Sequence, residues 1–335
     1  MGQLTTAQAQ NPDCANSELT IGAYPGSSHT VQSERLGIEL NLKNKLNGPP
    51  EQFRGSHLYF RPTNLEQATQ ILAAHSAQIL AGGTDFFPAL GDRRVQGPIL
   101  DLSRISTLKG IDTEAGWIRI GGLTTWSEII AAPMPRCFDA LKAAAREIGG
   151  VQIQNRGTIA GNLCNASPAA DGVPPLLALD AQVELVSATS VRKVPLASFI
   201  VGNRKTVREP DEILAAVLVP RGTDNAASAF TKLGARRYLV ISIVMVAAVV
   251  NTDSQGCISD ARVAVGSCSA RAARLPDLER ELVGMRAQHG FASILLPRHI
   301  AALSPISDVR ATAEYRRDAA LTLIGRAIDR CVGDN

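Results

Sequence analysis

The chain has 335 residues, enough for two or three domains that each bury a core. Hydrophobic residues make up 45% of it and charged residues 19%, a balance typical of a folded globular protein and not of a disordered one. The net charge is only +3, and no basic block with interleaved aromatic residues occurs, so the composition argues against nucleic-acid binding.

Cysteine usage and hydropathy narrow the class further. The six cysteines lie far apart without a C-x-x-C pair, which argues against a structural zinc site or a plant-type iron–sulfur loop and favours reduced thiols in the cytoplasm. The first residues show no basic start and no apolar core, so we expect no secretory signal. The longest apolar run, 238–250, is shorter than the roughly 20 residues of a membrane helix. We interpret it as a buried strand.

In chain order, residues 1–54 are polar with little periodicity, and we expect a partly ordered extension. A short strand over 57–60 should then lead into a helix capped by Thr63 or Asn64. We further predict a capped helix over 124–130 and strands over 78–80, 98–105, 116–122 and 212–220. The alternating apolar residues of 181–189 predict another strand.

The segment 221–227 is typical of a linker, and we place a domain boundary near residue 226. Beyond it, three sheet strands are predicted over 228–237, 238–250 and 258–270, and helices over 275–285 and 308–328. This mixture of strands and helices predicts an α+β fold. The predicted parts are the extension, a domain over 55–226 with lobes 55–112 and 113–226, and a smaller domain over 227–333.

Two glycine turns are the main candidates for a binding site. Ala81–Asp85 directly follows a strand, and Thr158–Asn162 lies in a stretch, 155–171, that is too rich in small residues for us to predict a helix or packed strand there. Side-chain-free positions let backbone N–H groups converge on an anion, and a diphosphate is the natural guest. Neither turn fits the G-x-G-x-x-G or the P-loop pattern. Each segment alone is more typical of a tight turn. Taken together, the two segments indicate a shared phosphate-binding cleft as readily as two unrelated turns.

The remaining candidates are weaker. The five histidines lie on separate segments without a carboxylate pattern, and no G-x-S-x-G elbow occurs. Ser167 precedes a proline and is interpreted as a turn residue, and Cys164 as packing, since no His or Lys adjoins it to lower its pKa. Arg236 and Arg237 are interpreted as a solvated or salt-bridged pair, with the binding of an acidic partner or a cofactor as the alternative. The residues thus predict a nucleotide-like cofactor between two lobes, without a protein nucleophile or metal.

Five segments, in order and at the right separations, carry a family resemblance: 81–90, 99–111, 118–129, 153–181 and 307–317. Together they resemble the FAD-binding, or medium, subunit of the molybdenum hydroxylases, the xanthine dehydrogenase and carbon monoxide dehydrogenase family. The resemblance covers about residues 56–330. It implies a two-lobed FAD-binding domain of the vanillyl-alcohol-oxidase (PCMH) type, followed by a smaller domain with a three-stranded sheet and helices.

The resemblance also implies the residues that hold FAD. The first FAD loop corresponds to Ile79, Leu80, Ala81, Gly82, Gly83, Thr84, Asp85 and Phe86. The second corresponds to Thr158, Gly161, Asn162, Cys164 and Asn165.

Four further residues match FAD contacts outside the two loops. Asp171 matches an acidic residue that holds the ribose or a nearby polar part of FAD. Ile148 and Leu214 match apolar contacts, and Lys232 a lysine near the flavin. No protein residue is expected to be catalytic, because the flavin carries its own redox chemistry.

The family implies a division of labour between subunits. A large subunit with a molybdenum cofactor hydroxylates the substrate, a small subunit with two [2Fe–2S] clusters relays the electrons, and FAD passes them to NAD⁺, a quinone or oxygen. Heterotrimers that dimerise, in the cytoplasm or exported with a signal-bearing partner, are the implied assembly. Two other functions stay open: a flavin-binding or assembly protein without turnover, and a self-contained flavin oxidase.

The chain departs from the family pattern after Arg236 and Arg237. The family more often has Asp where this chain has Val240, and Ala where it has Ser242. This segment borders the flavin, so the departures bear on the electron acceptor and on flavin reactivity.

Overall fold

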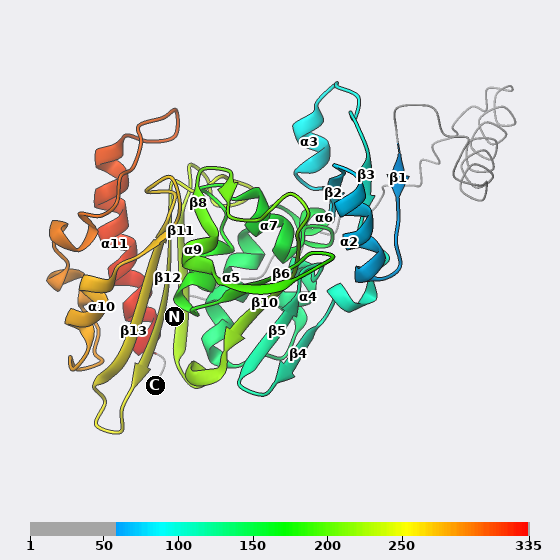
Figure 1. The fold of residues 1–335 in the computed structure, drawn as a ribbon. Helices are drawn as coiled ribbons and strands as arrows, with labels where there is room; N and C mark the ends of the chain where they lie inside the picture. Colours follow the sequence, from blue (N-terminus) through cyan, green and yellow to red (C-terminus); the bar gives the residue numbers. More distant parts are fainter. Residues whose placement is uncertain (1–57, 334–335) are drawn as a thin grey trace, which may run out of the picture. The chain divides into compact units, whose positions relative to one another are not determined.

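The computed structural model describes residues 58–333 (Figure 1). The predicted extension over residues 1–54 lies outside this range. The predicted α+β class is confirmed: three sheets of three, five and four strands and a two-stranded ribbon are combined with helices.

The first sheet is parallel, in the order β1–β3–β2, with β1 Tyr59–Phe60, β2 Gln78–Leu80 and β3 Ile99–Asp101. Helix α2 (Leu65–Ala74) begins at Asn64, whose side chain accepts a hydrogen bond from the Gln67 N–H at 2.9 Å. Of the two predicted caps, Asn64 is therefore the one used. The short helix α3 (Phe86–Leu90) and the 3₁₀ turn η2 (Ser106–Leu108) complete this part.

The second sheet is antiparallel throughout, in the order β4–β5–β10–β6–β7. Its strands are β4 Ile111–Glu114, β5 Trp117–Gly121, β6 Gln182–Val186, β7 Val191–Pro195 and β10 Ile213–Pro220. The helices of this part are α4 Trp126–Ala131, η3 Arg136–Phe138, α5 Asp139–Glu147, α6 Val151–Gln154, α7 Ile159–Asn165, α8 Val173–Ala178 and α9 Leu196–Phe199. A ribbon of β8 (Ile200–Gly202) and β9 (Lys205–Thr206) leads back to β10.

Helix α7 corrects the prediction for the small-residue stretch. Thr158 caps it, and the N–H groups of Ile159 and Ala160 donate to Thr124 O and Gly122 O at 3.0 and 3.1 Å. The stretch is helical because its first turn is bound to a neighbouring segment, although its own composition favours no regular structure.

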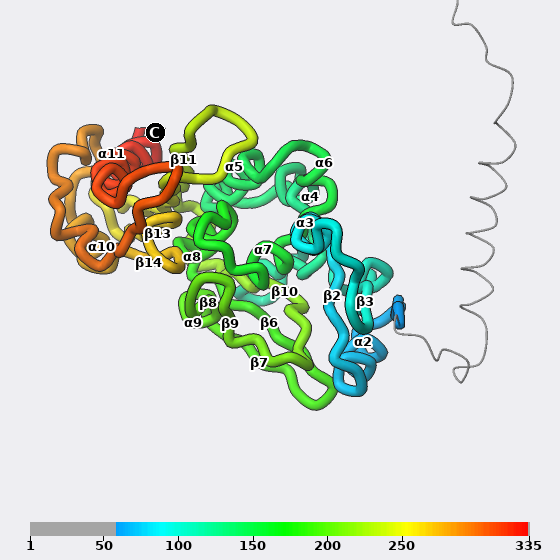
Figure 2. The backbone as a smooth tube through the Cα atoms, turned by 90° about the horizontal axis from the view of Figure 1, so that it is seen from above, coloured from blue at the N-terminus to red at the C-terminus, as the bar shows by residue number. Residues whose placement is uncertain are grey.

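The third sheet has the order β11–β12–β13–β14, with β11 Ala227–Leu233, β12 Val244–Thr252, β13 Ile258–Gly266 and β14 Ala273–Arg274. The three long strands were predicted and the two-residue β14 was not. Helices α10 (Pro276–Leu282) and α11 (Ala313–Val332) cover one face, and α5 and α8 the other (Figure 2). The 3₁₀ turns are η4 Arg221–Thr223, η5 Phe291–Ile294 and η6 Pro297–Ile300.

The apolar run 238–250 is a buried strand only in its second part. Along β12, Val244 and Val246 pack in the core under α11, and Met245 and Ala247 in the core under α8, so both faces are covered. Tyr238, at 64% exposure, belongs to the preceding loop. Predicting a strand from residue 238 was therefore wrong, because hydrophobicity alone does not reveal the turn there.

Several other boundaries differ from the prediction. The predicted linker 221–227 contains η4, and its last residue already begins β11. Helix α11 starts at Ala313 behind its cap Thr312, five residues later than predicted. Within residues 58–333, no helix combines the length and the apolar character that crossing a membrane requires.

Candidate functional site

A cleft of about 630 Å³ lies where the turn after β2, helix α7 and the start of β10 meet. Every residue of the two predicted loops lines it except Leu80, which is buried. Ile148 and Leu214, the predicted apolar contacts, line it as well, whereas Asp171 and Lys232 do not. The structure thus brings the two glycine turns to one cavity, as the sequence suggested.

The turn after β2 contacts the turn before α7, and the absence of a side chain at Gly82 permits this contact. A Cβ atom on Gly82 would lie 1.8 Å from the carbonyl oxygen of Arg156, in the turn before α7. Gly83 has a φ of 77°, in the left-handed region that glycine enters without strain. The glycines of the first turn therefore serve its contact with the second turn and its own backbone path.

The two turns differ in the hydrogen-bond donors that they leave free. At the start of α7, the N–H groups of Gly161 and Asn162 donate to the side-chain and backbone oxygens of Thr158, each at 3.1 Å. By contrast, the N–H groups of residues 82–85 donate to no acceptor within residues 58–333. The first turn is therefore the one whose backbone donors can take an anion, while the second provides mainly side chains.

Asn162 offers the second turn's clearest free group. Its Oδ1 is buried and has no hydrogen-bond partner among the described residues. A buried, unsatisfied acceptor is costly, and a bound ligand that carries hydroxyl groups would satisfy it.

Arg208 is a cleft residue that the sequence did not reveal. It lies in the loop between β9 and β10 and is the only Arg or Lys among the described residues that line the cleft. Its Nη1 donates to the carbonyl oxygens of Glu209 and Glu212 at 2.9 and 2.7 Å. One nitrogen of the guanidinium is thereby fixed, and no described residue accepts a hydrogen bond from the other two.

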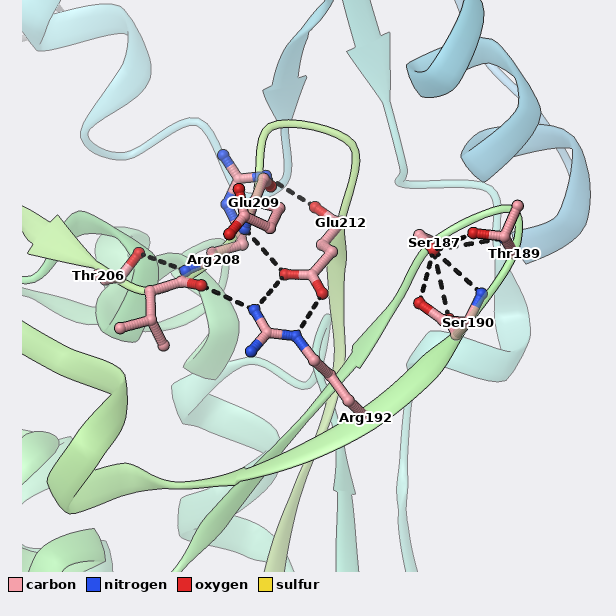
Figure 3. A network of polar contacts seen from close by, with 9 residues as sticks. Ser187, Thr189, Ser190, Arg192, Thr206, Arg208, Glu209 and Glu212 are labelled. Carbon is pink, nitrogen blue, oxygen red and sulfur yellow. Dashed lines mark hydrogen bonds and ion pairs between the residues drawn. The ribbon is translucent and has the colours of Figure 1, made fainter.

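The loop that carries Arg208 is held by an ion pair between the half-exposed Arg192 and the buried Glu212 (Figure 3). Glu212, 4% exposed, accepts from Arg192 Nε at 2.6 Å and Nη2 at 2.8 Å, and from the Glu209 N–H at 2.8 Å. Arg192 Nη2 also donates to Val207 O at 2.7 Å. These bonds to Arg192 hold the pKa of the Glu212 carboxyl below its usual value. Both ends of the loop are therefore fixed, and Arg208 between them is positioned.

Asp171 and Lys232 form an ion pair behind the cleft wall. Lys232 Nζ lies 2.7 Å from Asp171 Oδ2, and both side chains are more than nine-tenths buried. Ser242 Oγ donates to Asp171 Oδ1 at 2.5 Å, and Lys232 Nζ also donates to Glu147 O at 3.3 Å. Burial raises the pKa of Asp171, and the bonds to Lys232 and Ser242 oppose that rise. Lys232 thus contacts the residue before Ile148, which lines the cleft, so the ion pair lies next to the cleft without lining it.

Cys164 lines the cleft as a protonated thiol. Burial raises its pKa to about 11, and the nearby charge of Arg208 opposes this only in part. A thiol with that pKa is a poor nucleophile at neutral pH, in agreement with its interpretation as packing.

Two family models account for nearly all of the described chain. The FAD binding domain in molybdopterin dehydrogenase matches residues 51–222, and the CO dehydrogenase flavoprotein C-terminal domain matches residues 228–331.

Among individual proteins, the nicotinate dehydrogenase FAD-subunit of Eubacterium barkeri is 35% identical over 234 residues, 68% of this chain and 79% of that protein. The xanthine dehydrogenase FAD-binding subunit of Escherichia coli O157:H7 is 33% identical over 281 residues, 82% of this chain and 95% of that protein.

The structural comparison agrees with the sequence comparison. A chain of the reconstituted CO dehydrogenase from Oligotropha carboxidovorans superimposes with a TM-score of 0.77 at 26% identity, over 84% of this chain and 99% of that one. The cleft fits a dinucleotide cofactor, because it combines free backbone donors, one fixed cation and an unsatisfied acceptor. The chain therefore belongs to the family of FAD-binding subunits of the xanthine and CO dehydrogenase-type molybdenum hydroxylases, a family of oxidoreductases, and FAD is its cofactor.

Proposed function

We propose that the chain is the FAD-carrying electron-transfer subunit of a multi-subunit molybdenum hydroxylase. It takes electrons from the [2Fe–2S] clusters of a small subunit and passes them to NAD⁺, a quinone or oxygen. When bound, FAD supplies the redox chemistry of the electron transfer. The observation that carries the proposal is the meeting of both turns and Arg208 on one cleft.

The diphosphate of FAD would lie against the first turn. The free N–H groups of residues 82–85 supply donors, and Arg208 supplies a full positive charge on the same cleft. Backbone donors of a fixed turn need no reorganisation when the anion binds. Arg192 and Glu212 act as positioning residues, because they hold the loop and do not line the cleft.

The remaining contacts follow from polarity. Ile148 and Leu214 offer apolar surface to an aromatic ring of the cofactor, and Asn162 Oδ1 suits a hydroxyl group. Asp171 was predicted to hold a ribose, and Lys232 to lie near the flavin. Both oxygens of Asp171 already have partners, so a cofactor hydroxyl would share Asp171 with Lys232 and Ser242.

The assembly is part of the proposal. A large subunit with the molybdenum cofactor and a small [2Fe–2S] subunit would complete a heterotrimer, with dimers of heterotrimers in the cytoplasm. Substrate selection would then belong to the large subunit.

Released cofactor is the direct test. We expect the purified full-length chain to release FAD on denaturation and to reduce a dye with NADH at most, without hydroxylating any substrate. A colourless chain that cannot be reconstituted with FAD would contradict the cofactor assignment, and hydroxylation by the lone chain would contradict the division of labour. Co-purification from the native host would identify the partners.

A further inference from the structure

A second cavity, of about 590 Å³, lies between helices α5 and α11 and the loop after β11. Its wall carries six cationic side chains that come from three separate parts of the chain: Arg146, Lys232, Arg236, Arg237, Arg326 and Arg330. We call this cavity the arginine pocket.

The positive charge of the arginine pocket is largely uncompensated. Glu147 is the only carboxylate among its described lining residues, and Asp171 pairs with Lys232 from behind the wall. With Lys232 neutralised by Asp171, five arginines share the wall with one carboxylate, Glu147, which leaves four positive charges without a counter-charge. None of the five arginines has a carboxylate within 4.0 Å among residues 58–333.

Other arginines of the described chain are commonly paired. Arg119, Arg192, Arg274 and Arg316 each form an ion pair with a carboxylate. Like charges repel, so bringing five unpaired guanidinium groups to one concavity costs stability unless an anion fills it.

The guanidinium groups are partly pre-arranged. Arg236 Nε donates to Leu239 O at 3.2 Å, and Arg330 Nη1 donates to Phe230 O at 3.2 Å. The guanidinium groups of Arg146 and Arg326 have no partner among the described residues, and both side chains are exposed. Of the five guanidinium groups, two are thus fixed by the backbone, that of Arg237 lies over the Tyr238 ring at 5.3 Å, and two are free to close on a ligand. This arrangement suits the several oxygens of a phosphate group.

The arginine pocket adjoins the cofactor cleft. Glu147 lines the pocket and the next residue, Ile148, lines the cleft. A ligand held by its phosphates in the pocket would therefore lie beside the wall of the cofactor cleft.

We propose that the arginine pocket binds a phosphate- or diphosphate-bearing small molecule, and that its position selects a nicotinamide dinucleotide electron acceptor. The anion site stands on the charge and geometry of the pocket alone. Its assignment to the acceptor rests on the proposed flavin function.

Calorimetric titration of the full-length, FAD-loaded chain with NAD⁺, NADP⁺, ADP and inorganic phosphate tests the site. We expect Arg146→Gln and Arg326→Gln each to weaken dinucleotide binding about tenfold, as for the loss of one charge-assisted hydrogen bond. Arg317→Gln is the matched control, because Arg317 is an exposed arginine of α11 outside the pocket. Equal affinities in all three variants would overturn the proposal.

The ligands separate the possible sources of the phosphate. Tighter binding of a dinucleotide than of ADP or phosphate supports the acceptor, and equal binding of free phosphate overturns that assignment. The Arg146→Gln and Arg326→Gln chains are also tested for co-purification with partner subunits. If they lose these partners but bind every phosphate compound as wild type does, the pocket docks an acidic protein surface and the proposed anion site is overturned. FAD content is measured separately: a chain without FAD whose ADP binding still needs Arg146 and Arg326 would refute the proposed function and support the anion site.

Discussion

Gly82→Ala tests whether the contact between the two turns builds the cofactor cleft. The new Cβ would lie 1.8 Å from Arg156 O, and ordinary contact begins at 3.4 Å, so the turns must part by about 1.6 Å. The obstacle is backbone, which cannot rotate away as a side chain can. We expect a loss of about 2–3 kcal/mol, the upper part of the range for overpacking. That is a large share of a typical stability of about 5–15 kcal/mol, yet the chain should still fold.

The assays are thermal unfolding and released FAD per chain. We expect the Tm to fall by about 5–10 °C and FAD content to fall with it, since the free N–H groups of the first turn move away from the rest of the cleft. Gly222→Ala is the control, because no atom lies within 4 Å of its Cβ position and its φ is not left-handed. In Gly161→Ala the Cβ meets only Thr158 Oγ1, at 3.0 Å, so FAD loading should suffer more than the Tm. A Gly82→Ala chain with wild-type Tm and FAD content would refute the reasoning.

Three further predictions concern a buried carboxylate, a buried thiol and a left-handed loop residue. Glu212→Gln weakens the pair with Arg192 and should cost about 1–3 kcal/mol in chemical denaturation. Because the pKa of Glu212 is lowered, this difference from wild type should be present above pH 4.5 and vanish as the pH falls through the lowered pKa. Iodoacetamide should label Cys164 far more slowly than a free cysteine at neutral pH; equally fast labelling, seen by mass spectrometry, would contradict its raised pKa. Leu239 is left-handed, with a φ of 52°, and 59% exposed, so Leu239→Gly should raise stability by about 0.5–1 kcal/mol, and a lower Tm would count against this.

The sequence predicted the elements whose signals are local. The cap at Asn64 and the alternating pattern of 181–189 each depend on a few neighbouring residues. Helix α7 was missed because its order depends on the segment 122–124, to which its first N–H groups donate. Tertiary contacts of this kind override composition, and a single sequence does not display them.

The same distinction applies to the candidate site. The two glycine turns could be found by inspection, because small residues after a strand are a visible signal. Arg208 could not, since its place on the cleft depends on the pairing of Arg192 with Glu212 across twenty residues. In sequence it resembles any surface arginine in a loop. The sequence argument selected Gly82 because a glycine lets a phosphate approach the backbone. The structure adds a second reason, since the missing side chain also permits the contact with Arg156 O.

Val240 connects the chain's departure from the family pattern with the arginine pocket. Val240 lines that pocket and packs against Gly234: a Cβ atom added to Gly234 would lie 2.4 Å from a Val240 methyl carbon. An aspartate there, which the resemblance implies for the family, would add a carboxylate to a wall on which Glu147 is the only one among the described residues. Val240→Asp should therefore weaken phosphate binding severalfold while FAD content stays unchanged. Val240→Thr, similar in volume and without charge, is the control. Equal phosphate affinity in both variants would mean that the charge of the pocket does not govern what binds there.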